Sequence, residues 1–244
     1  MKLPILLLGG LSVLAIAACA DEDARRPGSG PPAELPGDTD ATLPAVVFLG
    51  DSLTAGRGLD REQAYPALLA PRLRELGFAS VDAGRSGDTT RGGMARLDGL
   101  FHRDVAVLVV ALGGNDMLRG VPLEETERNL RDIVAQARAQ EPPPRVILAG
   151  MRALPNLGAE YVEAFDAIYP RLAEQLDLPF VPFLLEGVGG EPEYNQDDQI
   201  HPNREGQAIL AETVWATLGD AVRGRTATGP APPGAPNDTT KRMR

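Results

Sequence analysis

Cysteine and histidine are both scarce in this chain of 244 residues, which contains one cysteine and two histidines. The single cysteine, Cys19, rules out a disulfide within the chain, and its early position rules out a cysteine nucleophile in a folded domain. The two histidines, His102 and His201, form no cluster and there is no cysteine pair, so we predict no metal site. Phosphate-binding and dinucleotide-binding glycine motifs are missing as well, and we predict no cofactor.

Positive charge is also in short supply. The chain has 24 Lys and Arg against 34 Asp and Glu, a net charge of −10. A protein that binds nucleic acid needs a basic surface to neutralise phosphates. The composition therefore argues against a nucleic-acid partner.

The longest apolar run is too short to be a confident membrane span. It covers residues 6–18 and follows Lys2, a pattern typical of a signal peptide, which we place at residues 1–18. The sequence Ile16-Ala17-Ala18-Cys19 resembles a bacterial lipobox, which implies that Cys19 is lipidated. The protein would then be exported and anchored to the periplasm-facing membrane surface of the cell envelope. The alternative is an ordinary signal peptide in which Cys19 is incidental.

Two segments are too polar and too rich in Pro and Gly to bury a core. Residues 19–43 are predicted to be the lipidated amino terminus and a flexible tether, and residues 224–244 a disordered tail. Residues 44–223 remain as one folded domain, whose size fits a single α/β unit. The oligomeric state is left open.

Strand-like and helix-like segments alternate five times through this domain. The expected strands are short apolar runs at residues 46–49, 79–83, 104–112, 145–149 and 180–181. The expected helices follow them at residues 60–76, 90–100, 122–140, 159–176 and 203–218. This alternation predicts a three-layer α/β/α fold with a five-stranded parallel sheet.

Three polar or glycine positions follow the first three strands. Ser52, Gly87 and Asn115 must therefore emerge at the carboxyl edge of the sheet, where open α/β folds bind ligands. His102 precedes the central strand and belongs to the opposite edge, so we interpret it as a surface or capping residue. His201 ends a long acidic loop, with two aspartates at 197 and 198 as candidates to orient its ring.

Four blocks of residues resemble, in order, those of the SGNH (GDSL) hydrolase family: Gly50-Asp51-Ser52-Leu53, Gly87, Gly113-Gly114-Asn115-Asp116 and Asp198-Gln199-Ile200-His201. The closest branch is the bacterial arylesterase, acyl-CoA thioesterase and lysophospholipase group, and the likeness covers residues 45–218. It implies the flavodoxin-like fold of that family. The branch usually has Asp-Gly where this chain has Asp198-Gln199, a departure that should remove neither catalytic role.

The resemblance implies a role for each block. Ser52 would be the nucleophile, His201 its general base, and Asp198 the carboxylate that orients the imidazole. The main-chain N–H groups of Ser52 and Gly87 and the side-chain amide of Asn115 would form the oxyanion hole. These roles agree with the chemistry, because a serine hydroxyl needs a base at neutral pH and an oxyanion needs neutral donors.

Candidate substrate contacts follow the fourth strand. Leu154 and Pro155 suit an acyl chain or an aryl group, although simple packing explains them equally well. Arg152 suits an anionic headgroup or an ion pair with Glu186.

The predicted activity is that of a serine ester hydrolase that cleaves carboxylic esters or thioesters, of small molecules or of lipids, through an acyl-enzyme. An alternative enzyme is a deacetylase of envelope polysaccharide. An alternative from another class is a non-catalytic binding lipoprotein that kept the fold.

Overall fold

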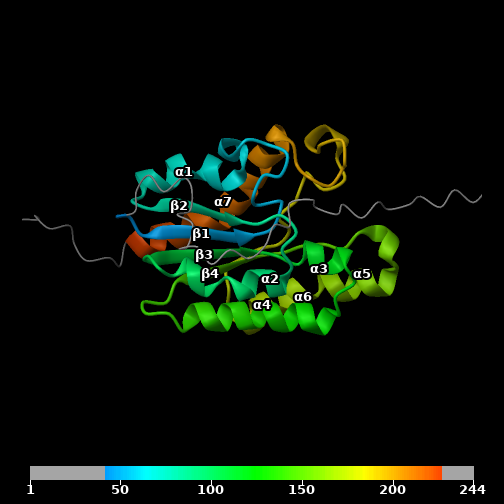
Figure 1. Cartoon of the computed structure of the whole chain (residues 1–244), viewed down its shortest axis with the longest axis horizontal. Helices are drawn as coiled ribbons and strands as arrows, with labels where there is room; N and C mark the ends of the chain where they lie inside the picture. The colour runs from blue at the N-terminus through cyan, green and yellow to red at the C-terminus, as the bar shows by residue number, and fades with distance from the viewer. Residues whose placement is uncertain (1–41, 227–244) are drawn as a thin grey trace, which may run out of the picture. The chain divides into compact units, whose positions relative to one another are not determined.

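A computed structural model describes residues 42–226, so the predicted signal peptide, most of the predicted tether with the candidate lipidation residue Cys19, and residues 227–244 of the predicted tail lie outside this range. Five strands form one parallel sheet in the order β2-β1-β3-β4-β5 (Figure 1). Their bounds are β1 Ala45–Gly50, β2 Ala79–Gly84, β3 Val105–Ala111, β4 Arg145–Ala149 and β5 Phe180–Val181. The predicted α/β fold with a five-stranded parallel sheet is confirmed.

The central strands are buried on both faces. All residues of β1 and β3 are buried, as the unbroken apolar runs in their sequences require. Gly50 at the end of β1 lies beside Gly84 of β2 and Ala111 of β3. The carboxyl ends of these three strands are therefore level, and the loops that follow them start side by side.

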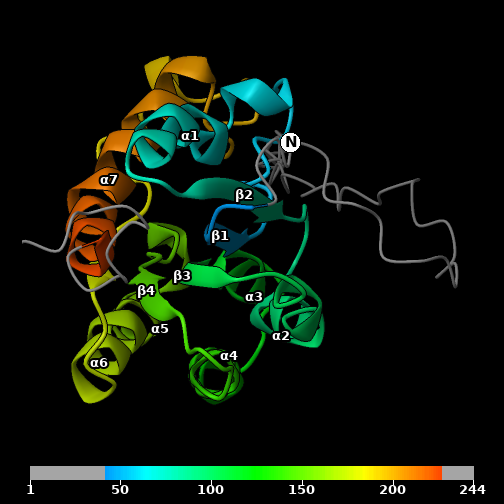
Figure 2. The same cartoon turned by 90° about the vertical axis from the view of Figure 1, so that its left-hand side faces the viewer.

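Helices cover both faces of the sheet. Figure 2 shows α1 and α7 on one face and α2, α4 and α6 on the other. The bounds are α1 Tyr65–Glu75, α2 Thr90–Ala95, α3 Gly114–Leu118, α4 Leu123–Arg138, α5 Ala159–Asp166, α6 Ile168–Gln175 and α7 Arg204–Thr226. Within residues 42–226, none of these helices combines the length and apolarity needed to cross a bilayer.

Several helices differ from the sequence-based expectation. The helix expected at residues 60–76 is a 3-10 turn at Arg61–Gln63 followed by α1, the helix expected at residues 90–100 ends at Ala95, and α3 was not expected. The helix expected at residues 159–176 is divided into α5 and α6 at Ala167. Pro170 explains the division, because its ring would collide with the carbonyl of Asp166 in a continuous helix. The last helix was expected to end at residue 218 but continues to Thr226, past the domain boundary placed at residue 223.

Candidate active site

Ser52, His201 and Asp198 are joined by two hydrogen bonds. Ser52 Oγ lies 2.9 Å from Nε2 of His201, and Nδ1 of the same ring lies 2.6 Å from Oδ2 of Asp198. A carboxylate only accepts, so Nδ1 carries the proton and Nε2 of the neutral ring is left to accept from the serine hydroxyl. Both Ser52 and His201 are buried. This arrangement can deprotonate the hydroxyl.

The turn at residues 198–201 holds the carboxylate that orients the ring. Asp198 Oδ1 accepts from the main-chain N–H groups of Ile200 and His201, at 2.9 Å each. Partial burial raises the pKa of Asp198, but these bonds and the bond from the His201 ring outweigh it and lower the pKa to about 2. Gln199 adopts a φ of 58°, in the left-handed region that glycine prefers. The departure from Asp-Gly thus leaves the turn intact.

Gly87 lies in a tight turn after β2. The N–H of Asp88 bonds to the carbonyl of Arg85 at 3.1 Å, and Gly87 within this turn has a φ of 82°. A Cβ at Gly87 would be 3.2 Å from the Arg119 guanidinium. Glycine therefore keeps the turn unstrained and its surroundings open.

Asn115 lies in the first turn of the short helix α3 and faces the turn that contains Gly87. Its Nδ2 donates to the main-chain carbonyl of Asp88 at 3.0 Å and to Oδ2 of Asp51 at 3.2 Å. The other carboxylate oxygen of Asp51 accepts from the N–H of Leu53 at 2.9 Å. Asp51 thus connects the serine loop to Asn115.

Asp51 is an ionisable group enclosed in this site. The residue is 2% exposed, and burial raises its pKa to about 6, against the opposing effect of the bonds from Leu53 and Asn115. The nearby carboxylates of Asp88 and Asp116 raise it further. Asp116 is also buried, and it accepts from the N–H and the hydroxyl of Thr90 at 2.8 and 2.5 Å.

The structure brings Ser52, Gly87, Asn115, Asp198 and His201 to the carboxyl edge of the sheet. His102 lies before β3, at the other edge, where its Nδ1 is 2.7 Å from the carbonyl of Gly99, as expected of a surface histidine. Four charged residues near Asn115 were given no role from the sequence: Asp51, Asp88, Arg96 and Asp116. Asp51 and Asp116 were missed although they belong to the Gly-Asp-Ser-Leu and Gly-Gly-Asn-Asp blocks.

The candidate substrate residues follow β4. The Arg152 guanidinium lies 3.5 Å from Glu186 Oε2 and 4.5 Å from the centre of the Phe183 ring. Leu154 and Pro155 are exposed, and the Leu154 N–H is 3.2 Å from Sδ of Met117 in α3. Of the two alternatives for Arg152, the structure favours the ion pair with Glu186.

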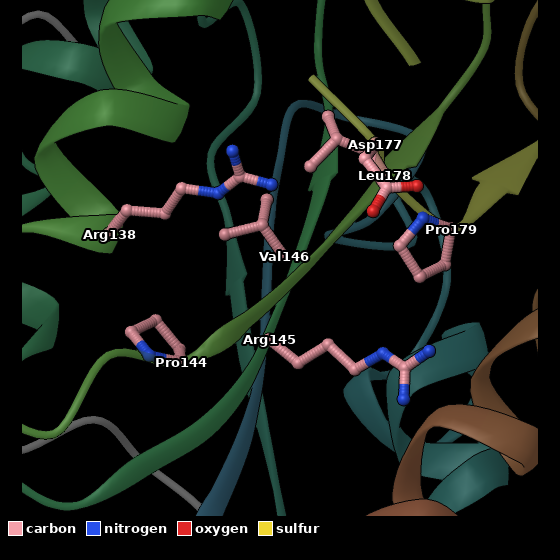
Figure 3. Close-up of a pocket in the computed structure, with 7 residues that line it drawn as sticks. All are labelled: Arg138, Pro144, Arg145, Val146, Asp177, Leu178 and Pro179. Atoms are coloured by element: carbon pink, nitrogen blue, oxygen red, sulfur yellow. The ribbon is translucent and has the colours of Figure 1, made fainter. Parts of the chain in front are cut away.

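A cavity of about 550 Å³ lies away from these residues (Figure 3). It is lined by Arg138 at the end of α4, by Arg145 and Val146 at the start of β4, and by Pro179 before β5. These positions are at the amino edge of the sheet, opposite the catalytic candidates.

Across residues 42–226 there is no group of three or more His, Cys, Asp or Glu side chains suited to hold a metal ion.

Comparison with known proteins points to one family. Residues 48–209 match the GDSL-like lipase/acylhydrolase family. The chain is 42% identical over 181 residues to "Esterase TesA" of Pseudomonas aeruginosa, covering 73% of this chain and 89% of the relative. It is 42% identical over 180 residues to "Thioesterase 1/protease 1/lysophospholipase L1" of Escherichia coli K12, covering 73% and 85%. The crystal structure of TesA superposes with a TM-score of 0.69 at 42% identity, covering 72% of this chain and 99% of that one.

Proposed function

This chain belongs to the GDSL-like lipase/acylhydrolase family and is an ester-hydrolysing enzyme, and we propose that Ser52 is its nucleophile. The observation that carries the proposal is the hydrogen-bonded series from Ser52 Oγ through His201 to Asp198. The serine loop and the turn at residues 198–201 are far apart in the sequence, and the fold brings them into contact.

The reaction has two steps. Ser52 Oγ attacks the acyl carbon while Nε2 of His201 takes its proton, and the same proton then passes to the leaving alcohol or thiol. A water molecule next attacks the acyl-serine with His201 as base, which releases the acid and restores the hydroxyl. Asp198, ionised because its pKa is about 2, stabilises the imidazolium formed in each step.

The negative charge on the substrate oxygen is received by three donors. They are the main-chain N–H groups of Ser52 and Gly87 and the Asn115 amide. In the resting site the amide bonds to Asp51 and to the carbonyl of Asp88, so one of these acceptors is exchanged for the oxyanion during catalysis. Asp51 is the partner to be replaced, since its bond of 3.2 Å is the longer one.

The substrate is proposed to carry an apolar acyl or aryl group. Among residues 42–226, the exposed large apolar side chains are Leu68 on α1 and four others, Leu118, Leu154, Leu157 and Ile200. The four lie on the segments that follow β3 and β4 and on the loop that ends at His201. Exposed apolar side chains around a hydrolytic site favour esters with apolar groups.

Lipid esters and thioesters are candidates because one relative is named a thioesterase and lysophospholipase. We also propose export and a lipid anchor at Cys19, which rest on the leader sequence alone. Mass spectrometry of the mature amino terminus tests the anchor. A diacylated or triacylated Cys19 would support it, whereas an unmodified amino terminus at another residue would refute it.

A chain-length series of p-nitrophenyl esters tests the substrate proposal. We expect hydrolysis to improve beyond acetyl as apolar surface is added to the acyl group. Cleavage of acetyl esters alone would favour the polysaccharide deacetylase. In parallel, a fluorophosphonate should label Ser52, and the Ser52→Ala variant should fold but lose turnover. Inertness toward every ester, together with no labelling, would favour the binding lipoprotein.

A further inference from the structure

The three proposed oxyanion donors belong to three separate segments. Ser52 follows β1, Gly87 follows β2 and Asn115 lies in α3 after β3. A rate gain from such donors requires that they be held in place before the charge develops. The sheet and the bond from the Arg85 N–H to the Gly50 carbonyl hold the starts of these segments together, and side-chain contacts must connect the parts that lie beyond them.

Arg96 makes this connection from the end of α2. Its Nη2 donates to the carbonyl of Gly50 at 3.0 Å, immediately before the serine turn. Its Nε donates to Oδ2 of Asp88 at 2.6 Å, and Asp88 closes the turn that contains Gly87. The main-chain carbonyl of the same Asp88 accepts from Asn115. One guanidinium thus contacts the first segment directly and the other two through Asp88.

Local packing leaves little freedom in this contact. The side chains of Arg96 and Asp88 are 21% and 12% exposed, so the pair is shielded from solvent. A Cβ at Gly92, in the first turn of α2, would lie 2.9 Å from Oδ1 of Asp88. Gly92 therefore leaves room for the Asp88 carboxylate to reach back toward Arg96 across the helix.

We propose that Arg96 is a positioning residue for catalysis, which sets the spacing of the oxyanion donors through Asp88 and Gly50. This proposal rests on the proposed function, since it assigns Arg96 to the oxyanion hole of that reaction. Two bonds in fixed directions need the planar fork of a guanidinium, whereas a lysine ammonium supplies a single charge point and cannot reproduce both. Charge alone is therefore insufficient at this position.

The first test compares Arg96→Lys with a matched control, Arg171→Lys. Arg171 in α6 also uses Nε and Nη2, on the carboxylate of Glu127, but lies outside the active site. We expect Arg96→Lys to lower kcat on a short p-nitrophenyl ester by about 10- to 100-fold. This decrease should not exceed the decrease in kcat that follows removal of one complete oxyanion donor. KM should be unchanged, because the substitution acts on the oxyanion donors and removes no group that binds the substrate in its ground state. The control should match the wild type.

The number of reactive sites shows whether Arg96 positions the oxyanion donors or only stabilises the folded protein. A fluorophosphonate titrates the fraction of molecules with a competent Ser52. If Arg96→Lys lowers only that fraction, with a normal rate per labelled site, then Arg96 is simply structural and the proposal is wrong. A normal kcat in Arg96→Lys would overturn it as well.

Chemical rescue provides the second test. Arg96→Ala should recover kcat with millimolar guanidinium but not with methylammonium, which matches the charge and lacks the fork. Equal rescue by both cations would contradict the proposal. If Arg96→Ala does not fold, Arg96→Gln, which retains one donor group, replaces it in the same kcat comparison. A failure of the proposed function is recognised separately, since Ser52→Ala would then remain active.

Discussion

Replacing Asp51 by asparagine should stabilise the protein and slow the enzyme. Asp51 is 2% exposed, and the pKa of its carboxyl is raised from the usual 3.8 to about 6, with burial as the main cause. The folded protein thus holds this proton more tightly than the unfolded chain. Stability falls as the pH rises from about 4 to about 6, and the full cost of the buried charge remains at pH 7.

The magnitude follows from the difference between the two pKa values. Each pKa unit is worth about 1.4 kcal/mol, so the buried charge costs about 3 kcal/mol above pH 7. The Asp51→Asn substitution would remove that cost but set the new amide protons against those of Asn115, which offsets about 1–2 kcal/mol. We expect a net gain of about 1–2 kcal/mol at pH 7. Turnover should fall about 10-fold or more, because the new amide protons at position 51 would repel those of Asn115 and turn this oxyanion donor out of line.

Urea unfolding of both proteins at several pH values between 4 and 7 measures the effect. The variant should be the more stable at pH 7, and its advantage should shrink steadily as the pH falls through 6, while other titrating groups cancel in the difference. A difference between the two proteins that is independent of pH would show that Asp51 does not titrate with a raised pKa. If the variant is less stable than the wild type at pH 7, the estimated free-energy cost of the buried Asp51 charge is wrong.

Other substitutions test the remaining parts of the site. Asn115→Ala should lower kcat about 10²- to 10³-fold with little change in KM, measured by steady-state kinetics; an unaltered kcat would remove the amide from the oxyanion hole. Gly87→Ala should lower kcat more than about 10-fold, because a φ of 82° disfavours alanine and the new Cβ would approach Arg119, and a fully active variant would contradict this. Asp198→Asn should lower kcat by about 10²- to 10⁴-fold in steady-state kinetics of the folded variant, whereas a normal rate would mean that another group orients the His201 ring.

The fold could be predicted because its signals are local. The run at β3 is apolar on both faces, and the alternation of strands and helices leaves few topologies. The helix boundaries that were predicted wrongly depend on interactions between residues in different turns. The helix expected at residues 159–176 divides at Ala167, because the clash of the Pro170 ring falls on the preceding turn. The last helix continues to Thr226 through Gly219, although a glycine at this position commonly ends a helix.

The active site also contains residues that the sequence predicts and residues that it does not. Ser52 and His201 were identifiable because they stand in motifs with a known chemical use. The residues alone left residues 197 and 198 as competitors, and it is Asp198 that bonds to the ring. Arg96 gave no signal, because an arginine within a predicted helix is usually a solvated residue. Its contacts with Gly50 and Asp88 arise only after β1, β2 and α2 are assembled.

Trapping the acyl-enzyme tests the central claim most directly. The protein is mixed with a p-nitrophenyl ester, quenched in acid during turnover, digested and mapped by mass spectrometry. The account predicts the mass of the acyl group on the peptide that contains Ser52, and its absence from the Ser52→Ala variant. An acyl group on a different residue, or continued turnover in the Ser52→Ala variant, would contradict it.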